Sequence, residues 1–180
     1  MISLANICVI LGGLYIVLHL PLMVMPQAAR RFLRAFPRNK WAGGGLAIVA
    51  LAWAAWEVYD MPLGMIDQYK IWLWAIGPVT GVLVLTFMNE LLAVRALGGI
   101  LMLAACPVLE IQRLNASYWT WVPAGLVYIW VVAGMILMLS PYRFRHVVER
   151  FCATDRGCMA MGAGGVAMGG VLIALGLRVF

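Results

Sequence analysis

Charged residues are scarce in this sequence. Only 11% of its 180 residues are Asp, Glu, Lys or Arg, and 65% are hydrophobic, whereas a soluble domain averages about 25% charged residues. A soluble chain of this composition lacks the polar groups needed to cover its surface, but in a bilayer the apolar side chains can face outward. The composition therefore predicts a single membrane domain over residues 1–180.

Catalytic and metal-binding motifs are missing as well. The chain has no H-E-x-x-H, Walker or G-x-S-x-G motif, and these are the patterns that would indicate a metalloprotease, a nucleotide-binding protein or a hydrolase. We therefore expect a protein that is not an enzyme, and the sequence assigns no metal and no cofactor. The net charge of +6 arises beside apolar segments, which favours membrane topology and not nucleic-acid binding.

Only four cysteines are present, and none forms a C-x-x-C pair. Cys8 and Cys106 lie toward the outer ends of two expected spans, where they either pair or serve as small buried residues. Cys152 and Cys158 fall in an expected cytoplasmic stretch, where thiols stay reduced.

Long apolar runs make up most of the sequence. Because a helix rises about 1.5 Å per residue and the hydrocarbon core is about 30 Å thick, one span needs about 20 apolar residues. Six stretches come close to this length, namely 2–25, 41–59, 71–88, 91–110, 118–140 and 158–178. Backbone groups must be paired within hydrocarbon, so the stretches are expected to be helices. The first has no basic residue ahead of it, which favours a retained helix and not a secretory signal.

The basic residues predict the orientation. Ten of the 13 Lys and Arg residues fall in the first, third and fifth connections, and three fall in the second and fourth connections and the C-terminus. Since Lys and Arg accumulate on the cytoplasmic side, both termini are expected on the opposite, periplasmic side of a bacterial inner membrane. The third connection holds little beyond Asn89 and Glu90, which predicts a tight hairpin.

An internal repeat joins two parts of the chain. Residues 26–36 (PQAARRFLRAF) align without gaps with 141–151 (PYRFRHVVERF), 115 residues later. Each segment reads as a short amphipathic helix, with apolar residues on one face and arginines on the others, and such a helix lies in the cytoplasmic membrane interface. A glycine-rich helix follows each copy. Small residues let membrane helices approach closely, so Gly12, Gly98 and the run 162–170 are expected at helix–helix contacts.

Together these features predict an all-α membrane protein with about six transmembrane helices, arranged as three hairpins over about 1–60, 69–112 and 117–180. The C-terminal hairpin resembles the small two-helix YjeT-like bacterial membrane proteins. The resemblance rests on Leu139-Ser-Pro141-Tyr-Arg-Phe-Arg145, on Arg156 and on the glycine-rich helix after it, with a fainter likeness over 15–60. That family implies architecture and no activity.

Tryptophan and tyrosine gather near the expected outer face. Most lie close to the ends of the second, third and fifth spans, and the six tryptophans of the group are Trp53, Trp56, Trp72, Trp74, Trp119 and Trp121. One interpretation is an interfacial belt, because these rings prefer the headgroup level. The other is a docking surface for a pigment, a quinone, a lipid or a partner helix.

Three ionisable residues are candidate functional groups. His19 lies within the first span, where an ionisable side chain is a functional candidate for haem ligation or quinone contact. A neutral histidine bonded to a neighbouring helix is the alternative. Glu57 and Glu110 lie at the outer ends of the second and fourth spans, where they either line the mouth of a cation path or face the interface.

Three hypotheses on function follow. The first is a non-catalytic subunit that contacts membrane lipids and other membrane subunits within a larger complex, for example a respiratory or photosynthetic one. The second is a small transporter or channel surrounded by the hairpins. The third is an electron-transfer subunit that contacts haem or a quinone through His19.

Overall fold

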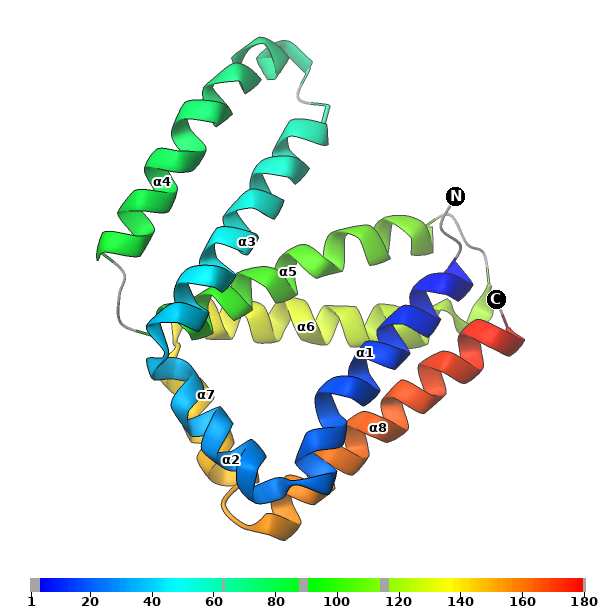
Figure 1. Ribbon diagram of the computed structural model, residues 1–180. Coiled ribbons are helices and arrows are strands. Elements are labelled where there is room, and N and C mark those ends of the chain that lie inside the picture. The colour runs from blue at the N-terminus through cyan, green and yellow to red at the C-terminus, as the bar shows by residue number, and fades with distance from the viewer. Residues whose placement is uncertain (1–3, 63, 88–90, 114–116, 180) are drawn as a thin grey trace.

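The chain is almost entirely helical where its structure is described. The computed structural model in Figure 1 describes residues 4–62, 64–87, 91–113 and 117–179, and no strand occurs in these ranges. The α-helices are α1 Leu4–Val24, α2 Pro26–Ala35, α3 Lys40–Asp60, α4 Leu73–Phe87, α5 Leu92–Arg113, α6 Trp121–Leu139, α7 Tyr142–Phe151 and α8 Asp155–Arg178. Short 3-10 turns are η1 Phe36–Arg38, η2 Gly64–Trp72 and η3 Tyr118–Thr120.

Six helices are long and apolar enough to cross a membrane, which confirms the predicted helical class and the number of candidate spans. They are α1, α3, α5 and α8 together with Lys70–Phe87 and Tyr118–Leu139. Their ends lie within a few residues of the predicted ones because hydropathy sets which stretches of the chain can lie in a span. The hairpin expected at Asn89 and Glu90 lies outside the described residues.

The most extensive helix contact joins the first and last helices of the chain. Helices α1 and α8 run antiparallel, with Ala5 beside Gly176 and Met23 beside Gly162. At the centre a Cβ on Gly12 would lie 2.6 Å from the Gly169 carbonyl oxygen, and one on Gly169 would lie 2.7 Å from the Gly12 carbonyl oxygen. Any side chain larger than hydrogen would therefore push these backbones apart.

Helices α5 and α6 pack in the same manner. A Cβ on Gly98 would lie 2.7 Å from the Gly134 carbonyl oxygen, and a Cβ on Gly134 would lie 2.6 Å from that of Gly98. Close backbone approach through glycine stabilises helix pairs where lipid supplies no hydrophobic force between them. Helix α1 then packs across this pair through Ile7 and Leu11, and the shared core is filled by Ala105, Val108 and Val127.

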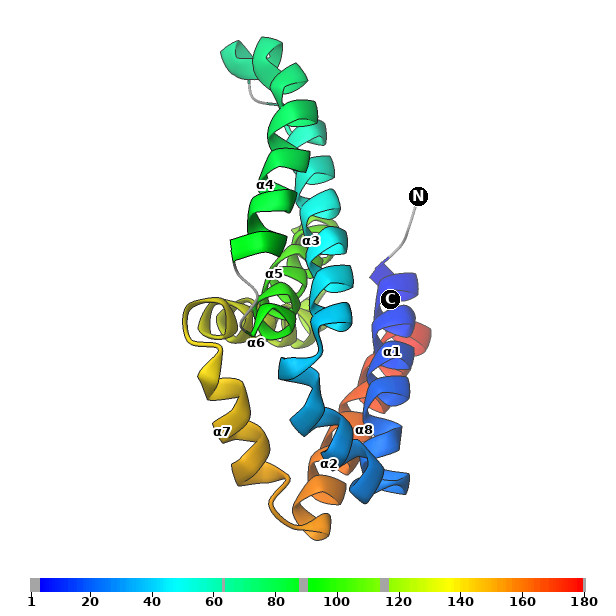
Figure 2. The same ribbon diagram turned by 60° about the vertical axis from the view of Figure 1, so that its left-hand side comes forward.

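Helices α3 and α4 form a separate projection, which we call the α3–α4 arm (residues 40–87). In both views it extends away from the other helices (Figures 1 and 2). The arm is anchored where α3 begins and α4 ends: Gly43 contacts Ala93 of α5, Ala47 is buried beside Leu92, and Val84 and Leu85 of α4 pack on the same cluster. The arm is thus attached to the rest of the described structure at one end.

These pairs differ from consecutive hairpins. The sequence grouped α1 with α3, α4 with α5, and α6 with α8, whereas the extensive contacts join α1 to α8, α5 to α6 and α3 to both α4 and α5. The short helices α2 and α7 account for this difference, because each separates two spans and turns the chain toward another partner. The relation of the three units 1–60, 69–112 and 117–180 by repetition stays a prediction.

Helix boundaries recur at the offset of the sequence repeat. Helix α1 ends at Val24 and α6 at Leu139, while α3 begins at Lys40 and α8 at Asp155, in each case 115 residues later. The residues before α3 and α8 are both side-chain caps: Asn39 accepts hydrogen bonds from the amides of residues 41 and 42, and Thr154 accepts one from the Gly157 amide. Capping of the first amides fixes where each helix starts.

The two repeated segments lie against each other. Rings of Phe36 and Phe144 are 5.9 Å apart, and Leu33 and Val148 belong to one apolar cluster with Cys152 and Cys158. The sequence predicted two separate amphipathic helices with their apolar faces in lipid. Instead, part of each apolar face is used for mutual packing, because the close approach of α1 and α8 brings α2 and α7 together (Figure 1).

Candidate functional site

Three aromatic rings, two from α1 and one from α6, stack on one another. The His19 ring lies parallel to the Tyr15 ring at 5.1 Å and 7°, and Tyr15 lies parallel to Trp130 at 5.8 Å and 8°. The Trp130 indole Nε1 donates a hydrogen bond of 2.7 Å to the Tyr15 hydroxyl. Offset-stacked rings attract each other beyond simple burial, and the indole finds its acceptor, so α1 and α6 are joined at one rigid point.

The position of His19 is set by α8. A Cβ on Gly165 would overlap the imidazole ring, so the absence of a side chain there creates the space that the ring occupies. His19 Nδ1 lies 2.9 Å from the Tyr15 carbonyl oxygen. A carbonyl only accepts, so Nδ1 donates this hydrogen bond, and in the neutral tautomer that does so Nε2 is the acceptor or ligand atom.

This arrangement suits contact with a flat conjugated group. Half-exposed rings of His19 and Trp130 bracket Tyr15, and an imidazole with a fixed tautomer offers Nε2 to a donor or a metal. Haem ligation by two histidines is not assembled within the described chain, because His146 lies in α7 with its ring edge-on to Tyr142 at 6.1 Å. Nor does any group of three His, Cys, Asp or Glu side chains suited to a metal occur in the described ranges.

The two outer glutamates do not meet His19 or each other. Glu57, half-buried in α3, accepts a 2.9 Å hydrogen bond from Trp53 Nε1 one turn earlier. Glu110 is exposed near the end of α5. Trp53 therefore serves to satisfy a carboxylate within its own helix, and the two acids lie on different helices.

The outer tryptophans form two groups instead of one surface. Trp53, Trp56 and Trp72 belong to the end of the α3–α4 arm, and Trp119 and Trp121 lie at the start of α6, away from the arm's end in both views (Figures 1 and 2). Apart from half-buried Trp53, these side chains are exposed. The side chain of Trp74 is outside the described part of the chain. Each group projects apolar rings at a helix end, as interfacial residues do.

All four cysteines are free. Cys8 is buried between α1 and α8, as the sequence predicted for a small packing residue, whereas Cys106 is exposed on α5. Cys152 and Cys158 are buried where α2, α7 and α8 meet, and Cys158 Sγ lies 3.9 Å from the Pro26 carbonyl oxygen.

The sequence singled out His19 and placed Gly165 among the glycines expected at helix contacts, but it did not indicate the neighbours Tyr15 and Trp130. A signal for one contact was present: Tyr15 and Trp130 are 115 residues apart, so they occupy equivalent positions of the internal repeat.

Comparison with protein-family models, curated proteins and solved structures gives no match to this chain. The resemblance to YjeT-like proteins therefore stays a prediction.

Proposed function

We propose that the protein is a non-catalytic integral membrane subunit that assembles with another membrane subunit through the α3–α4 arm. The observation that carries this proposal is the contrast in burial between helices. None of the Lys70–Phe87 span is buried within the described chain, whereas 39% of the α5 span is. A transmembrane helix that contacts few neighbours gains little from van der Waals packing.

The open face of the arm has the form of a helix-binding groove. A cavity of about 690 Å³ lies between α3 and α4, lined on one side by Leu51, Ala55 and Trp56 and on the other by Gly77 and Gly81. Nothing lies within 4 Å of a Cβ on Gly77, and only a Leu51 methyl does so for Gly81. Gly77 and Gly81 have the G-x-x-x-G spacing of close helix pairs, which supports a partner helix as the occupant.

We further propose a bacterial inner membrane with both termini on the periplasmic side. The antiparallel contact of α1 with α8 supports a common side, since it brings Ala5 next to Gly176. The arginine-rich helices α2 and α7 lie at the other end of that pair (Figure 1). Positive charges favour the cytoplasmic side, and so this end would face the cytoplasm.

Purification from the native membrane in a mild detergent tests the assembly. We expect the chain to migrate with a second polypeptide in a defined ratio, and Gly77→Leu to release it while the chain stays folded. Gly45→Leu is the matched control, because Gly45 lies on α3 with nothing within 4 Å and outside the groove lining. A monomer without partner at all detergent concentrations would refute the proposal.

A second candidate function is supported by the stack of His19, Tyr15 and Trp130. An electron-transfer subunit needs a conjugated cofactor held at a defined depth, and stacked rings beside an imidazole acceptor suit a quinone headgroup. An optical spectrum of the purified protein with organic extraction would decide. The absence of both a Soret band and an extracted quinone would reject this candidate. A transporter has less support, because Glu57 and Glu110 lie on different helices and do not converge on one site.

A further inference from the structure

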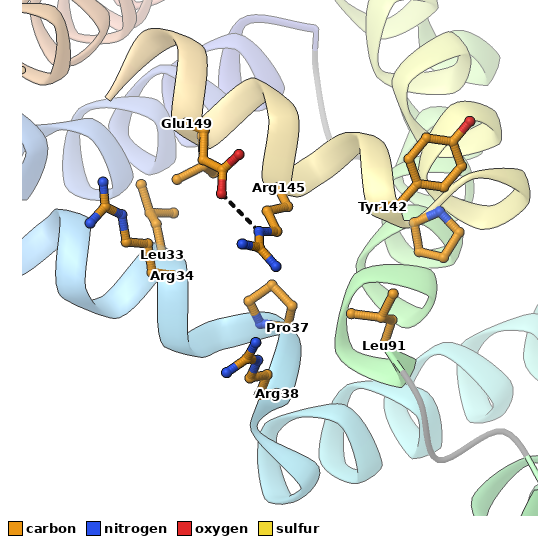
Figure 3. Close-up of a pocket in the computed structure, with 10 residues that line it drawn as sticks. Leu33, Arg34, Pro37, Arg38, Leu91, Tyr142, Arg145 and Glu149 are labelled. Atoms are coloured by element: carbon orange, nitrogen blue, oxygen red, sulfur yellow. Dashed lines mark hydrogen bonds and ion pairs between the residues drawn. The ribbon is translucent and has the colours of Figure 1, made fainter. Parts of the chain in front are cut away.

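A basic cavity lies where the two repeated segments meet. Its volume is about 700 Å³, and it is bounded by α2 with η1, by α7 and by the start of α5. Three guanidinium groups line it, those of Arg34, Arg38 and Arg145, against the single carboxylate of Glu149 (Figure 3). The cavity is therefore an electropositive site built from parts of the chain that are far apart in sequence.

Two of these arginines have no carboxylate partner. The ion pairs of the described residues join Arg30 to Asp155, Lys70 to Asp67 and Arg145 to Glu149. Arg34 and Arg38 thus lie beside the cavity with their charge uncompensated by a direct contact. Gathering like charges costs free energy, which an anion between them would offset.

The third arginine is only partly occupied. Its Nε donates a 2.7 Å hydrogen bond to Glu149 Oε1, and Figure 3 shows the two terminal nitrogens of Arg145 directed toward Pro37. The hydrogen bond from Arg145 also holds the pKa of Glu149 below its ordinary value. Glu149 therefore stays ionised and fixes the fork, while its terminal N–H groups remain available for the bidentate contacts that guanidinium groups make with phosphate.

The rest of the lining is apolar. Leu33, Leu91 and Val148 contribute hydrocarbon, Pro37 and Pro141 add rigid rings, and Tyr142 adds an aromatic face. A site for a small inorganic anion needs polar donors on most sides. A wall of hydrocarbon beside three guanidinium groups instead fits a ligand with an anionic head and an apolar body.

We propose that this cavity binds the phosphate headgroup of an anionic membrane lipid. The phosphate contacts Arg34, Arg38 and Arg145, and the first part of an acyl chain lies along Leu33 and Val148. A free phosphate ester offers the same headgroup chemistry, but it would leave the apolar wall uncovered. Basic pockets beside transmembrane helices bind anionic headgroups on the side where such lipids accumulate.

The site is a property of the single chain, and it does not depend on assembly through the α3–α4 arm. The cavity is lined by residues of both α2 and α7, so a bound lipid would contact both helices. Occupancy would therefore hold the two repeated segments together.

Lipid retention measured by native mass spectrometry tests the proposal. The full chain is reconstituted in nanodiscs of phosphatidylcholine with about one-tenth phosphatidylglycerol. It is then released from the nanodiscs in the mass spectrometer, and the mass of the chain with any retained lipid is measured. We expect one phosphatidylglycerol to be retained by the wild-type chain, and Arg34→Gln with Arg38→Gln to lower its apparent affinity about tenfold or more. The matched control, Arg31→Gln with Arg150→Gln, removes two exposed arginines from the same two segments outside the lining.

Two further measurements distinguish the possible causes of a change in lipid retention. Glu149→Gln frees Arg145 and should raise retention, a gain that misfolding cannot produce. Nanodiscs of phosphatidylcholine alone with added glycerol phosphate examine the soluble source. Equal losses in the cavity and control variants would overturn the site, and binding of glycerol phosphate as tight as that of phosphatidylglycerol would overturn the lipid assignment. Arm variants such as Gly77→Leu should retain the lipid normally, which separates this test from that of assembly.

Discussion

The α1–α8 pair and the α3–α4 arm use similar residues in opposite ways. Both contain glycines at helical spacing. On α8 these glycines meet the backbone of α1, as at Gly169 and Gly162, whereas Gly77 on α4 meets nothing within 4 Å. The same residue type thus completes a contact within the chain in one region and leaves a contact open in the other.

This difference separates the region that packs within the chain from the region through which we propose that the chain assembles. Membrane helices associate by close packing and not by exclusion of water. A pair with reciprocal glycine contacts has already gained that packing, and an arm with an empty G-x-x-x-G face has not. Substitutions should therefore change stability in the first region and assembly in the second.

The largest loss of stability is expected from Gly169→Leu. The new side chain would overlap the Gly12 carbonyl oxygen and the Ile16 side chain, and because a backbone oxygen cannot move aside we expect a loss of about 3 kcal/mol. The measurement is the free energy of unfolding in mixed detergent. The control is Gly170→Leu, at the next residue, where nothing lies within 4 Å of a Cβ. It should change the free energy of unfolding by less than about 0.5 kcal/mol, and equal losses at both positions would contradict the close contact of α1 with α8.

A smaller loss is expected from Tyr15→Phe. The change keeps the stacked ring but leaves Trp130 Nε1 without its 2.7 Å acceptor, and a lost hydrogen bond of this kind costs about 1 kcal/mol. Tryptophan fluorescence and the same unfolding measurement report it. Tyr128→Phe on the exposed face of α6 is the control, and a Tyr15→Phe chain as stable as wild type would remove the stack as a structural link.

The ion pair that joins α2 to α8 should contribute less. Arg30 Nη1 lies 2.6 Å from Asp155 Oδ1, but the two side chains are 23% and 43% exposed. Partly exposed pairs are screened, so Asp155→Asn is expected to cost about 0.5 kcal/mol, with the loss declining as salt rises. Thermal unfolding at low and high salt measures this, against Asp60→Asn at the exposed end of α3. A salt-independent loss would point to another role of Asp155 in the first turn of α8 and not to the pair.

The smallest effect on stability is expected in the arm. Gly77→Leu fills open space, so unfolding of the isolated chain should change by less than about 0.5 kcal/mol. The same variant should lose its partner subunit. Comparing its unfolding with that of Gly169→Leu in one detergent sharpens the contrast, and a large loss at Gly77 would show that the arm packs within the chain.

The sequence predicts the helices well because their ends follow hydropathy and caps, which are local. Asn39 and Thr154 could be recognised as helix starts, and the repeat of 26–36 at 141–151 coincides with repeated boundaries. Partner choice could not be predicted. The spans are apolar on most sides, so which glycine meets which, as Gly12 meets Gly169, depends on three-dimensional fit. The 115-residue offset of the repeat marks Tyr15 and Trp130 as equivalent positions without showing that they touch.

Photo-crosslinking in the native membrane tests the central claim most directly. A photo-reactive residue in place of Gly77 should form one covalent adduct of defined mass with a membrane polypeptide, while the same group in place of Gly170 on α8 should capture lipid alone. Lipid adducts alone at both positions would contradict assembly through the arm.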